Sequence, residues 1–249
     1  SHIKFLNKRG VGTSNVEISS AGKSFHWHAR YSGAMNEAEV ISTDLNILPF
    51  YNPRINDIAK KCEILFLANV DPPKQYEMIT EAKGAKIVIC DTMNYWIDTK
   101  PEELKKVLKR VNILLINEHE ARNLTKETNI ILALHKIVEM GPRTVVIKRG
   151  EYGSFVYSVG EKFFYVPAYP VTKVIDPTGA GDTFAGGFAG YLAICKNYSS
   201  FNEIKKAMLY GTVTASFMVE DFGHNRIAQV KLSDVKKRYK ELLSMLTIK

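Results

Sequence analysis

Apolar and polar positions alternate one by one early in the chain. Between residues 24 and 31, one side carries Phe25, Trp27, Ala29 and Tyr31, and the other carries Ser24, His26, His28 and Arg30. This period of two predicts a strand with two different faces. We expect one face to pack on the body of the protein and the other to meet a ligand or a partner subunit. Residues 1–9 precede this segment and stop at Gly10, a pattern typical of a short helix ended by glycine.

From about residue 52, short apolar runs alternate with amphipathic stretches. The runs at 63–70, 86–90, 111–116 and 144–147 predict buried parallel strands, and the stretches at 54–61, 73–83, 101–109 and 127–140 predict helices. Strand-like pieces follow at 153–158, 162–167 and 171–175, and the chain beyond residue 179 is mostly helical. This order predicts an α/β fold with a mostly parallel sheet. With no repeat or linker, we expect one domain over 1–249, with a small β element at about 11–50.

Composition narrows the class of protein. The chain has 249 residues, of which 45% are hydrophobic and 24% charged, as in globular proteins. Three widely spaced cysteines, Cys62, Cys90 and Cys195, indicate neither a disulfide framework nor a metal motif. Because no leader or long apolar run is present, we expect a cytoplasmic protein that does not bind membranes. The net charge of +8 suits an anionic ligand such as a nucleotide, but it is dispersed, so we do not expect nucleic-acid binding.

A loop of small residues leads into a helix that opens near Gly181. From Asp176 to Phe184 it reads DPTGAGDTF. Unpaired amides at a helix N-terminus bind anions, and Asp182 there could take a proton from a hydroxyl that attacks a phosphate. The alternative is that Asp182 only complements the helix dipole and the glycines only form a turn. The helix itself contains Gly186, Gly187 and Gly190, which predicts that another element approaches its backbone closely.

The stretch from Asp176 to Phe188 resembles the C-terminal signature of the ribokinase-like (PfkB) carbohydrate kinases. The resemblance implies a three-layer α/β sandwich with a mostly parallel central sheet and a small β lid near the N-terminus. It also implies that the protein transfers the γ-phosphoryl group of ATP, with Mg²⁺, to a hydroxyl of a carbohydrate or related small molecule.

The resemblance assigns roles to residues of this loop. Asp182 matches the general base, and the amides of Gly179, Ala180 and Gly181 match the anion hole for the transferring phosphate. Asp176 and Thr178 match positions that hold a monovalent cation in some members, so K⁺ is a candidate ligand.

Two further motifs follow predicted strands. Asn117 and Glu120 match the family's N-x-x-E, which implies that Asn117 lies near the ATP phosphates and that Glu120 places Mg²⁺ through water; alternatively the pair only caps a helix. Lys148, Gly150 and Gly153 match its K-x-G-x-x-G, which lines ATP; alternatively the glycines make a hairpin turn. A further pair, Asp91 and Asn94, follows another strand and either faces the phosphates or forms an ordinary turn.

The early strand corresponds to the family's lid. This implies that His26 and His28 contact the sugar, whereas the plainer interpretation is that both are merely exposed. Since the lid often dimerises in this family, the apolar side with Phe25, Trp27 and Tyr31 is a candidate homodimer surface.

Family members usually carry about sixty further residues before the point at which this sequence starts, including strands whose loss would leave a sheet edge open. That portion holds an acidic sugar ligand and a Gly-Gly motif, and neither is found here. We therefore expect an N-terminally short kinase chain. The alternative function is a non-catalytic, kinase-like protein that binds only a nucleotide or a partner.

Overall fold

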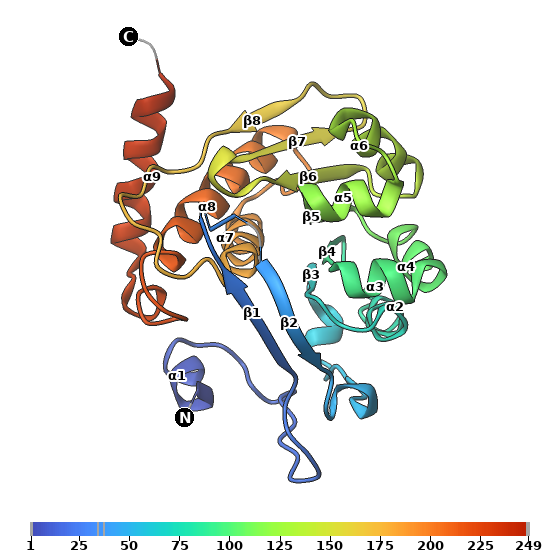
Figure 1. Ribbon diagram of the computed structural model, residues 1–249. Coiled ribbons are helices and arrows are strands. Elements are labelled where there is room, and N and C mark those ends of the chain that lie inside the picture. The colour runs from blue at the N-terminus through green and yellow to red at the C-terminus, as the bar shows by residue number, and fades with distance from the viewer. Residues whose placement is uncertain (1, 34, 37, 248–249) are drawn as a thin grey trace.

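A six-stranded sheet forms the centre of the protein, in a computed structural model that describes residues 2–33, 35–36 and 38–247 (Figure 1). The strand order is β3-β4-β5-β6-β7-β8, and the strands are β3 Ile64–Leu67, β4 Ile87–Asp91, β5 Ile113–Asn117, β6 Thr144–Lys148, β7 Ser154–Ser158 and β8 Phe164–Val166. Strands β3 to β6 are parallel, whereas β7 and β8 are antiparallel to their neighbours. The mostly parallel sheet predicted from the apolar runs is confirmed.

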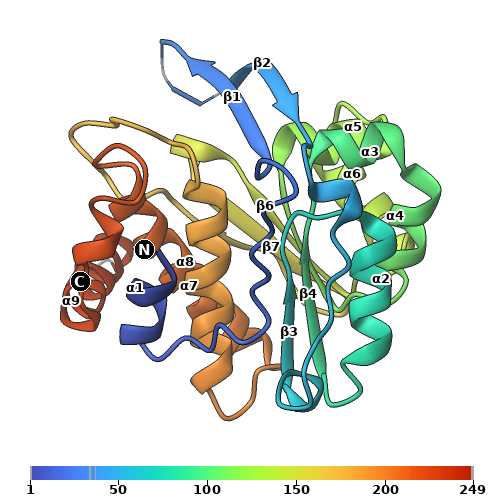
Figure 2. The ribbon, with the colours of Figure 1, turned by 90° about the horizontal axis from the view of Figure 1, so that it is seen from below.

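Helices cover both faces of the sheet, which lies between the two layers in Figure 2. One layer contains α2 Pro72–Glu81, α3 Asn94–Thr99, α4 Pro101–Leu108, α5 Glu118–Thr125 and α6 Ile130–Glu139. The other contains α7 Ala180–Ile194, α8 Phe201–Met218 and α9 Leu232–Leu246. Each layer has its own core, because neighbouring strand residues such as Ile89 and Cys90 point to opposite faces. This is the three-layer sandwich that we expected.

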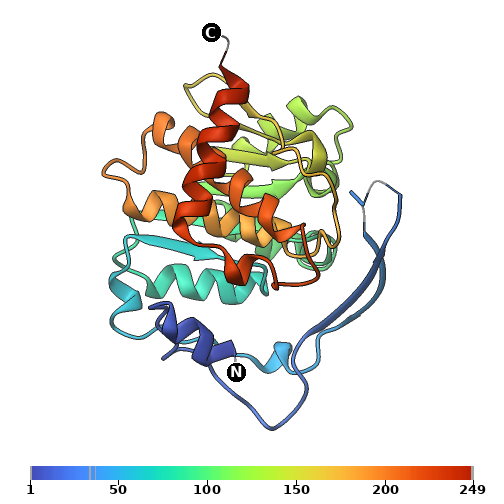
Figure 3. The ribbon, with the colours of Figure 1, turned by 90° about the vertical axis from the view of Figure 1, so that its left-hand side faces the viewer.

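A two-stranded antiparallel hairpin, β1 His26–Tyr31 and β2 Ala38–Asp44, projects from one side of the body (Figure 3). Trp27, Ala29 and Tyr31 are half-buried, whereas His26, His28 and Arg30 are exposed. The two-faced strand is therefore confirmed for residues 26–31, whereas Phe25 precedes β1 and is 40% exposed. Helix α1 (His2–Lys8) precedes the hairpin and is followed by Gly10 at φ 76°, as predicted, although Ser1 lies outside the described residues. No strand lies in residues 11–25, so the regular part of the expected β element is shorter than 11–50.

Helices α7 and α8 pack closely, and glycine makes the approach possible at one place. A Cβ on Gly187 would lie against the side chain of Thr214 and 2.9 Å from the carbonyl oxygen of Tyr210. The close approach predicted from the helical glycines is thus confirmed at Gly187. It is wrong for Gly186 and Gly190, where a Cβ would meet nothing within 4 Å.

Two expected elements are wrong. Residues 54–61 form only the 3₁₀ turn Ala59–Lys61, before which the Asn56 side chain accepts the Ala59 N–H. Ile58 is 83% exposed, so the segment offers no continuous apolar stripe to bury. Residues 171–175 form no strand; the Ile175 N–H donates to the carbonyl of Val219 at 2.8 Å, and the exposed Val174 and Ile175 side chains lack a neighbouring strand. Helix α3 was not expected at all.

Candidate functional site

The carboxyl ends of β4 and β6 bring a buried ion pair together. Lys148 is the last residue of β6, and its Nζ lies 2.8 Å from Oδ2 of Asp91, the last residue of β4. The two side chains are 15% and 8% exposed. In an open α/β sheet this edge is where ligands bind. This contact directs the Asp91 carboxylate toward Lys148, and whether Asp91 faces the ATP phosphates stays a prediction.

Lys148 remains an ammonium ion. Burial alone would lower its pKa, but the carboxylates of Asp91, Glu120 and Asp182 outweigh burial and raise the pKa above its usual range. These interactions bring residues from β4, β6, α5 and α7 to one place. They also leave three carboxylates facing one cation.

The first turn of α7 lies beside this ion pair. Gly179 is the N-cap residue with φ 79°, a conformation that glycine adopts readily. A Cβ on Gly181 would lie 3.4 Å from Nζ of Lys148, so the ammonium stands next to the helix N-terminus. The Ala180 N–H donates to the carbonyl of Pro177 at 3.1 Å, and so the protein itself uses one of the three amides assigned to the anion hole.

Asp182 lies in the first turn of α7 and is accessible to solvent. Partial desolvation by surrounding protein atoms raises the pKa of its carboxyl group, and the negative charge of Asp91 raises it further, while Lys148 opposes the shift. A carboxylate with a raised pKa is a better proton acceptor near neutral pH. The Asp182 carboxylate is therefore both accessible to solvent and a stronger base than an ordinary aspartate.

Glu120 and Asn117 form a capping box at the start of α5. The Asn117 side chain accepts the Glu120 N–H at 2.8 Å, and the Glu120 carboxylate accepts the Asn117 N–H at 2.9 Å. The expected cap is therefore present, and the roles of Asn117 and Glu120 toward ATP and Mg²⁺ stay a prediction that is compatible with it. Burial raises the pKa of Glu120 to about 7, with Asp91 adding to the rise and Lys148 opposing it. This carboxylate consequently takes up a proton close to neutral pH.

We predict that Glu120→Gln stabilises the protein above pH 7. The native pKa lies above the usual value of 4.5, so the native state binds more protons than the unfolded state between pH 4.5 and 7, and stability falls as the pH rises through that window. Glutamine keeps the cap and removes the buried charge. The variant should gain roughly 1–3 kcal/mol at pH 8 and nothing below pH 4.5, as measured by thermal melting.

The matched control is Asp234→Asn, at the corresponding but only half-buried position of the capping box of α9. It should show no gain at pH 8. A Glu120→Gln variant that is less stable than the unsubstituted protein at pH 8 would contradict the assignment.

The loop after β6, with Lys148, Gly150 and Gly153, folds back on neighbouring elements. A Cβ on Gly153, at φ 81°, would lie 2.7 Å from Cα of Pro167, so only glycine fits. Arg149 Nε donates to Glu118 Oε2 at 2.8 Å, which ties this loop to the start of α5. The pair joins the two loops that were matched to ATP-binding motifs, and it was not anticipated from the sequence.

The tip of the hairpin reaches the same loop. Asn36 Nδ2 donates to Glu151 Oε1 at 2.5 Å, and Asn36 Oδ1 accepts the Glu151 N–H at 3.3 Å. Gly150 has φ 54°, and a Cβ there would lie 2.8 Å from Asn36 Oδ1. The hairpin thus contacts the loop that follows Lys148, although 115 residues separate Asn36 from Glu151.

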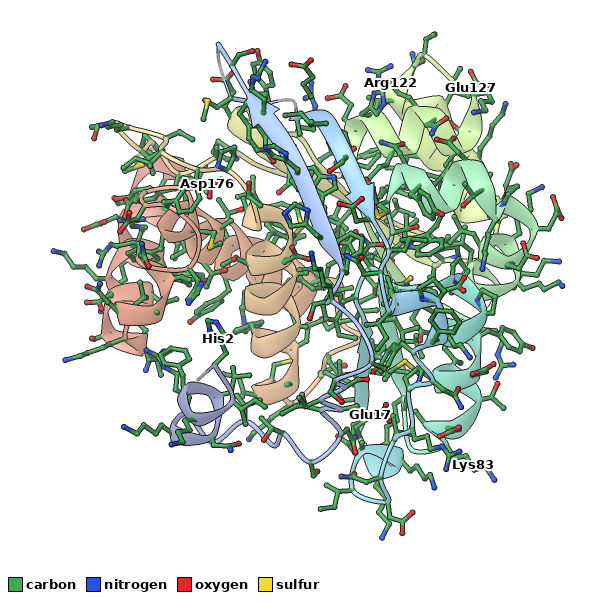
Figure 4. The ribbon with its side chains drawn as sticks, turned by 60° about the horizontal axis from the view of Figure 1, so that its bottom comes forward. His2, Glu17, Lys83, Arg122, Glu127 and Asp176 are labelled. Carbon is green, nitrogen blue, oxygen red and sulfur yellow. The ribbon has the colours of Figure 1, made fainter. Side chains whose placement is uncertain are left out.

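Asp176 joins the loop before α7 to the loop after α8. Its carboxylate accepts the Thr178 N–H at 2.9 Å and the Gly223 N–H at 3.0 Å, and it is 8% exposed. These bonds lower the pKa of Asp176 although burial acts in the opposite direction. Figure 4 shows Asp176 on one side of the hairpin and Arg122 and Glu127 on the other.

The two histidines of the hairpin lie outside this cluster. His26 Nδ1 lies 3.4 Å from Asp44 Oδ2 on the neighbouring strand, and the rings of His26 and His28 have centroids 6.3 Å apart. In the described part of the chain, neither histidine contacts Asp182 or Lys148. The sugar-contacting role assigned to them stays a prediction.

Comparisons with known proteins agree with the fold and the motifs. Residues 1–230 match the model of the pfkB family of carbohydrate kinases, and the chain belongs to this family. A cytidine kinase from Thermococcus kodakarensis is 32% identical over 134 residues, covering 52% of this chain and 48% of that protein. A nucleoside kinase from Methanocaldococcus jannaschii is 32% identical over 161 residues, covering 65% of this chain and 50% of that protein. The chain therefore spans about half the length of these relatives.

Solved structures share the fold. The crystal structure of the nucleoside kinase of Methanocaldococcus jannaschii aligns with a TM-score of 0.76, 22% identity and coverage of 97% of this chain and 76% of that one. A ribokinase II from E. coli, in complex with ATP and Mg²⁺, aligns with a TM-score of 0.75 and 20% identity, covering 96% of this chain and 78% of that one. Arabidopsis thaliana ribokinase, in complex with ribose and ATP, aligns with a TM-score of 0.74 and 23% identity, covering 96% of this chain and 78% of that one. These likenesses establish a ribokinase-like fold.

Proposed function

We propose that this protein transfers the γ-phosphoryl group of ATP to a hydroxyl of ribose or a ribonucleoside. The observation that carries the proposal is the meeting of Asp182, the amides at the start of α7 and the Lys148 ammonium at the carboxyl edge of the sheet. Three relatives, named cytidine kinase, nucleoside kinase and ribokinase, carry names of acceptors that contain ribose or a related sugar. The proposed class of acceptor, ribose or a ribonucleoside, is based on the names of these relatives.

In this proposal Asp182 is the general base. It accepts the proton of the acceptor hydroxyl, whose oxygen then forms a bond to the γ-phosphorus as the bond to the β,γ-bridging oxygen breaks and ADP leaves. The amides of Gly179 and Gly181, with that of Ala180 once Pro177 releases it, would hold the equatorial phosphoryl oxygens. The Lys148 ammonium neutralises charge on the same group.

ATP would lie along the ends of β5 and β6, between Asn117 and the loop with Gly150 and Gly153. The donor chemistry fits Mg²⁺, because Glu120 offers a hard carboxylate ligand and the three carboxylates around Lys148 outnumber that single cation. Within the described residues no three His, Cys, Asp or Glu side chains form a metal cage. In this proposal Glu120 would hold Mg²⁺ through water, and the ion would supply charge neutralisation at the ATP phosphates.

A monovalent cation such as K⁺ fits beside Asp176 and Thr178 in this scheme. The Asp176 carboxylate already fixes two loops whose backbone carbonyls are ligands of the type that K⁺ prefers. A homodimer through the hairpin is also part of the proposal, on the side with Phe25, which is 40% exposed, and the half-buried Trp27 and Tyr31. Over residues 2–33, 35–36 and 38–247, no helix is both long and apolar enough to cross a membrane.

The direct test is transfer of labelled phosphate from γ-labelled ATP to a panel of ribose, cytidine, adenosine and fructose. We expect product with at least one ribose-containing acceptor and a loss of product when Mg²⁺ is chelated. Labelling of none of the four would reject the proposed function of this chain, and labelling of fructose alone would reject the acceptor class.

We predict that Asn36→Asp opens the hairpin. The substitution places a carboxylate against that of Glu151 in place of the amide donor. Like charges in an exposed position repel by roughly 1 kcal/mol, so the KM for the acceptor should rise about 3- to 10-fold. Hydrogen exchange of residues 26–44 should become faster, which mass spectrometry measures without any need for activity.

A second substitution makes the test specific. In the double variant Asn36→Asp/Glu151→Gln, the new glutamine amide can donate to the new carboxylate, so exchange and KM should return toward those of the unsubstituted protein. Ser32→Asp adds the same charge to the hairpin at an exposed position and should change neither. Equal effects of Asn36→Asp and Ser32→Asp would contradict a contact through Glu151.

A further inference from the structure

Asp91 has no defined part in the proposed transfer, yet three contacts fix it at the edge of the sheet. One carboxylate oxygen accepts the Thr92 N–H at 2.9 Å, and the other accepts from Lys148 Nζ at 2.8 Å. Its backbone carbonyl accepts from Gln75 Nε2 at 3.2 Å, and the same amide donates to Ala68 at 2.9 Å. Since Gln75 is only 1% exposed, the ends of β3 and β4 are locked together beneath the carboxylate.

Lys148 depends on this anchor for its position. A lysine side chain has a flexible four-carbon stem and many rotamers, and an ammonium has three N–H donors, of which Asp91 takes one. The ammonium is held 3.4 Å from the place where a Cβ on Gly181 would be. The remaining donors are therefore available where a phosphoryl group would meet the first turn of α7.

Stability alone does not account for the pair. Taking two charges out of water costs about as much as their attraction returns, so a buried ion pair adds little to folding compared with apolar side chains. A cation that is fixed in advance, by contrast, stabilises developing charge without reorganising during the reaction. The location of the pair, at the ends of neighbouring strands and beside one helix N-terminus, fits the second use.

We propose that Asp91 is a positioning residue that holds the Lys148 ammonium over the amides of α7, so that the terminal phosphoryl group of ATP meets a cation already in place. The proposal rests on the proposed function, since it requires that ATP binds at this edge. Asp91 itself need not touch the nucleotide. It acts through Lys148.

The test compares MgATP with MgADP, which lacks the terminal phosphoryl group. Calorimetry gives both dissociation constants for the unsubstituted chain, for Asp91→Asn, for Lys148→Met and for the double variant. We expect the unsubstituted chain to prefer MgATP, and each single substitution to reduce that preference about 10-fold, the value of roughly one charge-assisted bond. Because Asp91 acts through Lys148, the double variant should lose no more than Lys148→Met alone.

Two results would overturn the role of Asp91. One is an Asp91→Asn variant with the original preference for MgATP; the other is a double variant whose loss is the product of the single losses, since Asp91 would then act independently. Asp91→Glu provides the same test if Asp91→Asn does not melt cooperatively, because it keeps the charge but displaces the ammonium. It too should lose the preference.

Controls separate this proposal from the function on which it rests. Glu63→Gln removes a carboxylate from the Glu63–Lys86 ion pair at the opposite edge of the sheet and should leave the preference unchanged. If the unsubstituted chain binds neither nucleotide, the proposed function fails and the role of Asp91 fails with it. If it prefers MgATP and Asp91→Asn does so equally, only the role of Asp91 is rejected.

Discussion

Asp182→Asn is expected to abolish phosphoryl transfer while MgATP binding persists. Asparagine has the shape of aspartate but cannot accept the proton of the acceptor hydroxyl, and loss of a general base usually lowers kcat by about 10²- to 10⁴-fold. Removing a negative charge near the ATP phosphates should leave the affinity for MgATP equal or slightly higher. Initial rates on the best acceptor and calorimetric dissociation constants measure the two effects separately.

The matched control is Asp234→Asn, which removes an acidic side chain from the first turn of α9, another helix. It should keep both rate and affinity. An Asp182→Asn variant with more than about a tenth of the original rate would remove Asp182 from the role of base, because base removal costs more than that.

Gly181→Val is expected to eliminate detectable MgATP binding. The backbone of Gly181 lies in an ordinary helical conformation, and valine has a higher helix propensity than glycine, so the helix can accommodate valine there. A Cβ would already lie 3.4 Å from Nζ of Lys148, and the two methyl groups of valine extend beyond it into the space of the phosphate. Loss of the anion site should weaken binding at least about 100-fold, since charge-assisted bonds to the phosphate are lost.

Gly186→Val is its control on the same helix. It introduces the same side chain at an exposed glycine where a Cβ meets nothing within 4 Å. The variant should bind MgATP normally and melt at a similar temperature. Equal binding by the Gly181→Val and Gly186→Val variants would show that the start of α7 is not where the phosphate binds.

The layered fold could be predicted because buried parallel strands are apolar on both faces. Strands β3 to β6 stand out as short apolar runs for that reason, and the helices between them carry one apolar stripe each. The apolar residues of 54–61 do not share one buried face, since Ile55 is in the core whereas Ile58 is 83% exposed. The pattern therefore resembled a helix where only one turn forms. Helix α3 is only six residues long and has no side-chain cap, which left no local signal.

The candidate site also has a part that could be predicted from the sequence and a part that could not. Asp182, Gly181, Asn117 and Glu120 could be found from sequence because each motif is local and directly follows a strand or precedes a helix. The bond between Asp91 and Lys148 joins residues 57 positions apart, and the contact between Asn36 and Glu151 joins residues 115 apart. Such pairs depend on the order of strands in the sheet and on the placement of the hairpin. No local pattern contains that information.

Titration of MgATP into this chain by calorimetry tests the central claim most directly, because it needs no knowledge of the acceptor. The arrangement of the α7 amides, Lys148 and the loop with Gly150 predicts saturable binding of about one nucleotide per chain, at a site that the Gly181→Val variant has lost. No binding by a chain that still melts cooperatively would contradict the claim that a nucleotide site is built at the carboxyl edge of this sheet.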